Sequence, residues 1–280
     1  QGKWVAEAEF KGIAGFHLNE LATPWRRWSE VVDDFLKARK SPETLKTWVN
    51  TSLGETWEET AEGRDPAGLL ERRENYTPTT LPRRVLYLTA GVDVQADRLE
   101  MEVVGWRMDG PDYPPESWGV EYIVIPGDPA KLETWQQLDY LLAGEWKTED
   151  GRALRLGAVC IDSGGHHTAQ VYAFCEARVG RSIFAIKGMA GKAPIWAPNA
   201  RKSRRYQAKV WHVGSEAGKE TWYARLRIKE AGPGYCHFPL AYDQRYFEGL
   251  TAERVRTKYI RGHAVREWFL PSGRRNEPLD

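Results

Sequence analysis

Two aspartates stand where β-prone runs end, and their side chains could bind a divalent metal ion. Asp93 lies in the apolar run Val85–Val94, and Asp162 directly follows the short run 156–161 and precedes Ser163-Gly164-Gly165. A carboxylate within an apolar strand is costly to bury without a partner. In open α/β sheets, ligands bind at the carboxyl ends of strands. Both positions therefore favour a functional site, although ion pairing or turn capping would also explain them.

A third acid, Asp280, ends the stretch Arg275-Asn276-Glu277-Pro278-Leu279-Asp280. Asn276 can cap a helix and Pro278 fits a first turn, so we expect Asp280 to lie at the start of a helix. If the three acids converge, their mutual repulsion requires a cation. Oxygen ligands select Mg²⁺ or Mn²⁺, and two such ions can promote phosphodiester hydrolysis.

The elements that must position these acids follow from hydrophobic patterning. Strands are expected over 85–94, 99–106, 121–125, 156–161 and 182–187, and helices over 133–143 and 166–178. A hairpin-rich start followed by alternating helices and strands predicts a mixed α/β sheet flanked by helices. Upstream, residues 25–38 read as an amphipathic helix, a second helix is expected from Ser41, and residues 55–80 as a linker or strap.

This order of acids and elements resembles the RNase H-like nuclease fold. The local sequences are similar to those of the lambda-type phage terminase large subunit family, at Gly91-Val92-Asp93-Val94-Gln95, Asp97-Arg98-Leu99-Glu100, Ile161-Asp162-Ser163-Gly164-Gly165 and the final six residues. The upstream pieces Gly15-Phe16-His17, Pro24-Trp25, Val49-Asn50-Thr51 and Leu53-Gly54-Glu55 are similar to the segment that joins the ATPase and nuclease domains of that family.

The resemblance implies that Asp93, Asp162 and Asp280 bind the catalytic Mg²⁺ or Mn²⁺ ions. It implies an endonuclease that cuts concatemeric phage DNA in the host cell cytoplasm, with the terminase small subunit and the portal protein of the procapsid as partners. Residues 1–80 would be the extension that joins an ATPase domain, and residues 81–280 the nuclease domain.

We expect the ATPase domain itself to be missing from this chain, because no GxxxxGK[ST] motif is present. Gly214–Glu220 imitates that motif but has one residue too few between its glycines, so it is interpreted as the start of a helix. The family pattern also commonly continues past its last aspartate.

Cationic residues for double-stranded DNA cluster after the fifth expected strand. They are Lys187, Lys192, Arg201, Lys202, Arg204 and Arg205, around a loop rich in Gly, Ala and Pro. Such side chains are suited to sequence-independent phosphate contacts. Glu100 could supplement the metal shell but is expected to be a surface acid.

Composition sets the remaining limits. The net charge is +1, so DNA binding must come from local clustering of cations. Three cysteines without a CxxC pair favour neither a disulfide framework nor a zinc site. No apolar stretch is long enough for a transmembrane helix, and no secretory signal is expected. The thirteen tryptophans are expected mainly in packing roles.

Three alternatives stay open from the residues alone. One is another RNase H-like nuclease, of the transposase, integrase or resolvase type. A second is a non-catalytic DNA or portal docking module with its acids in salt bridges. The third is a tryptophan-rich carbohydrate binder or glycosidase.

Overall fold

Two units make up the chain, residues 1–62 and 63–280. The computed structural model describes residues 12, 16, 18–39, 45, 47–55, 66–191, 193–203, 205–206, 208–260 and 263–279, with the backbone alone for 66, 256–260 and 263–267. None of the described helices combines the length and apolar character that crossing a bilayer requires.

The first unit contains the expected amphipathic helix, α1 (Trp28–Ala38). Val31 is buried on its inner side, while Trp28, Val32 and Leu36 are exposed. Two short helical segments, η1 (Glu20–Ala22) and η2 (Val49–Leu53), complete this unit. The second helix expected from Ser41 begins outside the described residues.

The second unit begins its central sheet with an antiparallel meander. It consists of β2 (Tyr87–Val94), β3 (Arg98–Arg107) and β4 (Glu116–Pro126). The sequence predicted all three strands, because each has the β-branched and aromatic content of a pleated surface. The third extends further toward the N-terminus than expected.

Parallel strands then extend the sheet on the other side of β2. They are β7 (Leu156–Asp162), β8 (Ile183–Met189) and β10 (Lys209–Gly214). Helices α4 (Leu132–Leu142) and α5 (Thr168–Glu176) lie in the connections before β7 and β8. Parallel neighbours need such crossovers, which explains the alternating pattern read from the sequence.

The later elements were mostly not anticipated. The whole sheet has nine strands in the order β1-β11-β4-β3-β2-β7-β8-β10-β9. The remaining described elements are α3 (Pro66–Glu71), β1 (Arg73–Glu74), β5 (Trp146–Lys147), β6 (Ala153–Leu154), η3 (Val179–Arg181), β9 (Arg201–Lys202), α6 (Ser215–Leu226), β11 (Cys236–Pro239), α7 (Gln244–Leu250), β12 (Arg254–Ile260) and β13 (His263–Phe269). Helix α6 begins at the predicted place, directly after Gly214.

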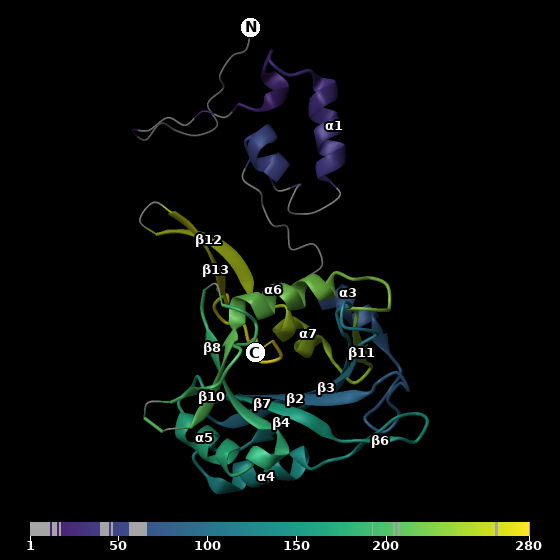
Figure 1. Ribbon diagram of the computed structural model, residues 1–280, viewed down its shortest axis with the longest axis vertical. Coiled ribbons are helices and arrows are strands. Elements are labelled where there is room, and N and C mark those ends of the chain that lie inside the picture. Colours follow the sequence, from purple (N-terminus) through teal and green to yellow (C-terminus); the bar gives the residue numbers. More distant parts are fainter. Residues whose placement is uncertain are drawn as a thin grey trace. The chain divides into compact units, whose positions relative to one another are not determined.

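Helices cover the sheet from both sides (Figure 1). The main core lies between the sheet and α4 and α5, and includes Val92, Ile161, Leu138 and Phe174. A second cluster joins α3, α6 and α7 to β11 on the other face, around Phe238 and Phe247. The mixed sheet and its flanking helices are those of the expected RNase H-like α/β fold.

Candidate metal centre and DNA-binding surface

Asp93 and Asp162 lie side by side at the carboxyl ends of two parallel strands. Asp93 is near the end of β2 and Asp162 is the last residue of β7, and the register pairs Val92 with Ile161 directly before them. Val92 and Ile161 point into the main core. Because side chains alternate along a strand, both aspartates point to the opposite face of the sheet.

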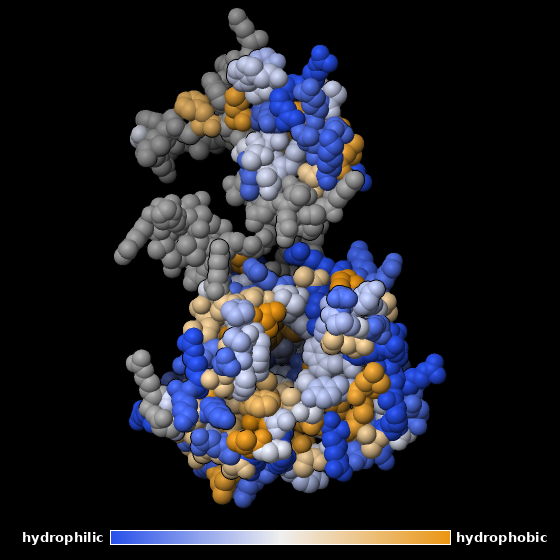
Figure 2. All heavy atoms as spheres, viewed as in Figure 1, coloured by the Kyte–Doolittle hydropathy of each residue, from blue (hydrophilic) through white to orange (hydrophobic). Residues whose placement is uncertain are grey.

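This part of the face is open. Gly91 is exposed, and a Cβ added there would meet no atom within 4 Å. Figure 2 shows the surface hollowed between β8 and α7, on the same side of the sheet as α6 and α7. The two carboxylates are half-buried, so they remain accessible to an ion or a substrate from this side.

Burial raises the pKa of both carboxyl groups above the ordinary value. For Asp93, hydrogen bonding from the Gln95 side chain opposes the rise, and the negative charge of Asp162 adds to it. For Asp162, opposition comes from backbone N–H groups, including that of Gly164 at 3.1 Å, and from the charge of Lys187. The pair is therefore a site of unfavourable negative charge.

Neither aspartate forms an ion pair with another described residue. Two neighbouring carboxylates that form no ion pair with a described residue fit a hard divalent ion, which prefers oxygen ligands. Among the described residues, no group of three or more His, Cys, Asp or Glu side chains is arranged to hold a metal. A third protein ligand would therefore come from outside them, and Asp280 itself lies outside the described residues.

Glu100 neighbours Asp93 on β3, but it is already occupied by protein partners. The register pairs the two residues, and Glu100 is only 5% exposed, so the expectation of a surface acid was wrong. Arg98 forms an ion pair with Oε1, and the Tyr122 hydroxyl donates to Oε2. These bonds satisfy a charge whose burial alone would be costly.

The same arginine attaches the C-terminal segment, residues 273–279, to β3. The Arg98 guanidinium lies 2.9 Å from Glu277, and Arg275 lies 3.1 Å from the same carboxylate. Asn276 donates to Glu253 at 2.7 Å. Residues 276–279 form a turn closed by the Leu279 N–H to the Asn276 carbonyl, at 2.7 Å. The last described residues are thus held next to the strand that neighbours Asp93.

A groove of about 1010 Å³ lies beside this segment, between α7 and strands β3 and β4. Its lining includes Glu100, Tyr122, Tyr246 and Glu277, but neither Asp93 nor Asp162. Within this groove the carboxylates of Glu100 and Glu277 are already paired with Arg98 and Arg275.

Four of the six expected DNA-binding cations are described, three of them on or just after the edge strand β9 and one on β8, two strands further in. Lys187 is exposed on β8, Arg201 and Lys202 are exposed on β9, and Arg205 is exposed just after it. None of the four forms an ion pair with another described residue. The other two, Lys192 and Arg204, lie outside the described residues.

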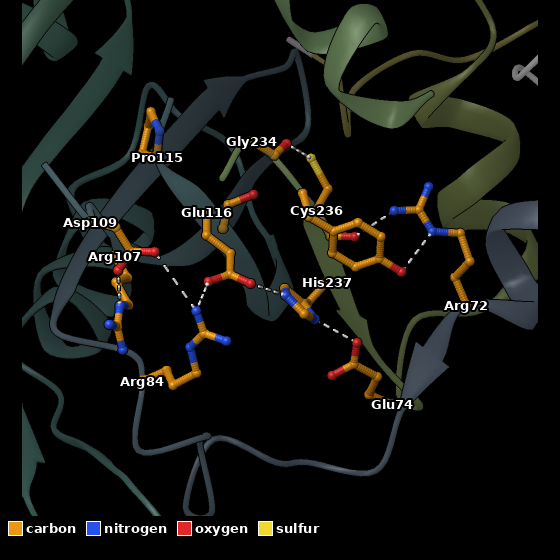
Figure 3. Close-up of polar contacts among 12 residues, drawn as sticks. Arg72, Glu74, Arg84, Arg107, Asp109, Pro115, Glu116, Gly234, Cys236 and His237 are labelled. Atoms are coloured by element: carbon orange, nitrogen blue, oxygen red, sulfur yellow. Dashed lines mark hydrogen bonds and ion pairs between the residues drawn. The ribbon is translucent and has the colours of Figure 1, made fainter. Parts of the chain in front are cut away.

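Sequence reasoning missed a polar network at the N-terminal end of β4. His237 lies between two carboxylates, with Nδ1 2.5 Å from Glu74 and Nε2 2.9 Å from Glu116 (Figure 3). Arg84 lies 2.9 Å from Glu116, and the His237 ring stacks on Trp118 at 4.7 Å. These contacts join β1, β11 and β4, so we assign the network a structural role.

No local signal in the sequence could have revealed this network, because His237 is more than 100 residues away from both Glu74 and Glu116. Arg98 and Glu277 are likewise 179 residues apart. The imitation phosphate loop is a helix start, as predicted, and its Lys219 pairs with Glu253 at 2.5 Å.

Comparisons with known proteins show which family the chain belongs to. Residues 13–280 match the family described as "Terminase large subunit gpA, endonuclease domain". The chain is 34% identical over 276 residues to a protein of Enterobacteria phage P21, described as "Terminase, large subunit". It is 32% identical over 273 residues to the protein of the same description in Escherichia phage lambda.

Each match covers 95% of this chain and 42% of the relative, so the chain spans about two fifths of the length of these proteins. No solved structure matches it significantly. The family match over nearly the whole chain, together with the RNase H-like fold, places this protein in the endonuclease domain family of phage terminase large subunits.

Proposed function

We propose that this chain is a Mg²⁺- or Mn²⁺-dependent endodeoxyribonuclease that cuts concatemeric phage DNA for a genome-packaging motor. One observation carries the proposal: Asp93 and Asp162 lie together on an open face of the sheet, and neither forms an ion pair with a described residue. Charge of this kind is unfavourable until a cation binds. The absence of a described ion pair also argues against a docking module with its acids in salt bridges.

In this proposal Asp93 and Asp162 hold the ions, and Asp280 supplies the third carboxylate. When bound, two such ions activate a water nucleophile and stabilise the leaving oxygen of the phosphodiester. Arg98 and Glu277 would act as positioning residues, because they fix the segment that leads to Asp280. Gln95 and the Gly164 N–H orient the two strand carboxylates.

Double-stranded DNA would lie along the edge that carries Lys187, Arg201, Lys202 and Arg205, with Lys192 and Arg204 contributing. Cations without protein partners are available for phosphate contacts, which carry no sequence preference. Sequence selection would then come from the terminase small subunit, and docking from the portal protein. Residues 1–80 would join an ATPase domain, and the motor would act in the host cell cytoplasm.

The test is plasmid nicking by the 280-residue chain with Mg²⁺, Mn²⁺ or EDTA. Cleavage should require a divalent ion and should fall by at least about 10³-fold in Asp93→Asn and Asp162→Asn, since electrostatic stabilisation at such sites is worth several kcal/mol. Asp112→Asn, at an exposed loop position, should cleave like the parent chain.

Thermal unfolding gives a readout independent of activity. Mn²⁺ should stabilise the parent chain by mass action and should not stabilise Asp93→Asn. Without metal, Asp93→Asn should be at least as stable as the parent, because it removes a charge that burial disfavours. Nicking in EDTA, or no nicking together with no Mn²⁺-dependent shift, would overturn the nuclease proposal.

A further inference from the structure

A continuous row of residues crosses the sheet from the paired aspartates to its outer strands. Asp162 pairs with Ile186 on β8, and Ile186 pairs with Trp211 on β10. Neighbouring strands are about 4.8 Å apart, so the backbone of Trp211 lies roughly 10 Å from that of Asp162. Directly paired residues point to the same face, so Trp211 shares the open face with the aspartates.

Three aromatic residues form what we call the aromatic strip: Phe184, Trp211 and Trp196. The Trp196 and Trp211 rings are stacked, with centroids 5.5 Å apart and planes at 25°. Phe184 meets Trp211 edge to face at 6.2 Å. Trp196 reaches the strip because its backbone bridges to Val213 along the outer edge of β10.

The aromatic strip is not part of either hydrophobic core. The core positions of β8 and β10 are Ile183, Ala185 and Val210, which alternate with the strip and point to the other face. Phe184 and Trp211 are half-buried, and Trp196 is 43% exposed. Trp196 is therefore presented to solvent at the outer end of a row that begins at Asp162, with Trp211 and Phe184 partly exposed beside it.

Cations border the aromatic strip on its outer side. Lys202 pairs with Lys209 across β9 and β10, and both exposed lysines share the face of Trp211, whereas Arg201 pairs with the core residue Val210 and points to the other face. Aromatic faces next to a basic edge are the combination by which proteins bind single-stranded nucleic acid, with bases on the rings and phosphates at the cations.

We propose that the aromatic strip binds unpaired nucleotides of the DNA next to the cut, by stacking bases on Trp196. Bases within a duplex already stack on each other, so an exposed indole face fits a strand whose bases have been separated. The proposal rests on the nuclease function above and adds a part of its substrate: a melted or frayed strand rather than intact duplex alone.

The experiment compares a fluorescein-labelled single-stranded oligonucleotide with its blunt duplex, by fluorescence anisotropy in EDTA so that nothing is cut. Trp196→Ala should weaken single-strand binding roughly 5- to 150-fold, the value of one base–aromatic stack. Duplex binding should change less than about twofold, since the phosphate contacts remain. Trp196→Phe keeps a ring and should retain most of the affinity.

Tyr140→Ala is the matched control, because Tyr140 is an 81% exposed aromatic residue on α4, over the opposite face of the sheet. It should leave both affinities unchanged. Equal losses for single strand and duplex in Trp196→Ala, or no loss for either, would overturn the proposal. Quenching of tryptophan fluorescence by the oligonucleotide should also diminish in Trp196→Ala, and unchanged quenching would count against stacking on that ring.

Failure of the two proposals can be told apart. Asp93→Asn should lose nicking and keep single-strand binding, because the strip does not use the metal. If the parent chain binds the single strand through Trp196 but never nicks, the nuclease proposal is refuted and the proposal for the aromatic strip stands. If the parent chain nicks DNA with metal but Trp196→Ala does not change single-strand binding, only the proposal for the aromatic strip is refuted.

Discussion

At the residue scale, the chain buries acids in two different ways on one face of the sheet. Glu100 is compensated by Arg98 and Tyr122, whereas Asp93 and Asp162 lie together without an ion pair to a described residue. Since the fold supplies Glu100 with a cation and a hydroxyl, similar partners could also have been placed beside Asp93 and Asp162. A cost in stability of this kind is expected where a site serves function, which agrees with the proposed role of the pair.

Glu102, the next acid along this face, is half-buried beneath α7 and provides a pH-dependent prediction. The Tyr242 and Tyr246 hydroxyls donate to its Oε1 at 2.9 and 2.7 Å. Burial outweighs these bonds and raises the pKa of Glu102 from 4.5 to about 7. A raised pKa stabilises the fold below about pH 4.5, and this contribution is lost as the pH rises through 7.

Glu102→Gln should therefore stabilise the protein at pH 8, by on the order of 2 kcal/mol, and have little effect near pH 4.5. The amide oxygen can still accept both tyrosine bonds. Urea denaturation at the two pH values measures the difference. Glu176→Gln, at an exposed position of α5, should show no such pH-dependent gain, and an equal gain for both variants would contradict the assignment.

At the element scale, the C-terminal segment depends on a glycine of α7. A Cβ at Gly249 would lie 2.8 Å from Pro278 Cδ, closer than real contacts allow. Helix α6 offers a matched site, since a Cβ at Gly218 would meet nothing within 4 Å. Alanine at Gly218 therefore tests helix propensity alone, whereas alanine at Gly249 also tests the packing of α7 against the C-terminal segment.

Gly218→Ala should stabilise the protein by about 0.5–1 kcal/mol, the usual gain of alanine over glycine in a helix. Gly249→Ala should lose that gain and displace residues 275–279, which hydrogen exchange would report as faster exchange in the segment. If Asp280 is a ligand, Mn²⁺ affinity should also fall in Gly249→Ala. Identical exchange in both variants would show that Gly249 does not hold the segment.

At the scale of the whole molecule, the charges nearly cancel, with 40 lysines and arginines against 39 acids. DNA binding must then depend on where the cations are. The described edge around β9 carries exposed cations without ion pairs, whereas cations elsewhere, such as Arg178 and Arg181, are paired with Asp139. In the proposed DNA complex, the local arrangement of cations would thus take the place of net charge in binding phosphates.

The double variant Arg201→Gln/Lys202→Gln should weaken duplex binding and reduce the slope of log affinity against log salt by about 2, because each lost phosphate contact removes about 0.9. Filter binding between 50 and 200 mM salt would measure it. Arg155→Gln, at an exposed position between β6 and β7, should leave the slope unchanged. An unaltered slope in the double variant would place the DNA elsewhere.

The sequence by itself predicted five strands of the sheet, β2, β3, β4, β7 and β8, and the two helices α4 and α5 that connect them. It also gave the positions of the acids along the chain. The hydrophobic patterns of residues 85–94 and 156–161 are local, so they predict strands even when the fold is not known. The order of the short motifs also determined the family. The role of the acids as ligands and the division at residue 80 stay predictions.

Only the tertiary structure decided which residues meet. Adjacency of Asp93 and Asp162 depends on a parallel pairing across nearly 70 residues, and the attachment of Glu277 to Arg98 spans 179. The same holds for Glu100, whose burial comes from Tyr122 and the C-terminal segment, and for Trp196, whose place beside Trp211 comes from the β10 edge. Contacts between distant segments leave no periodic trace in the chain, because their energy comes from packing and pairing that exist only once the sheet has formed.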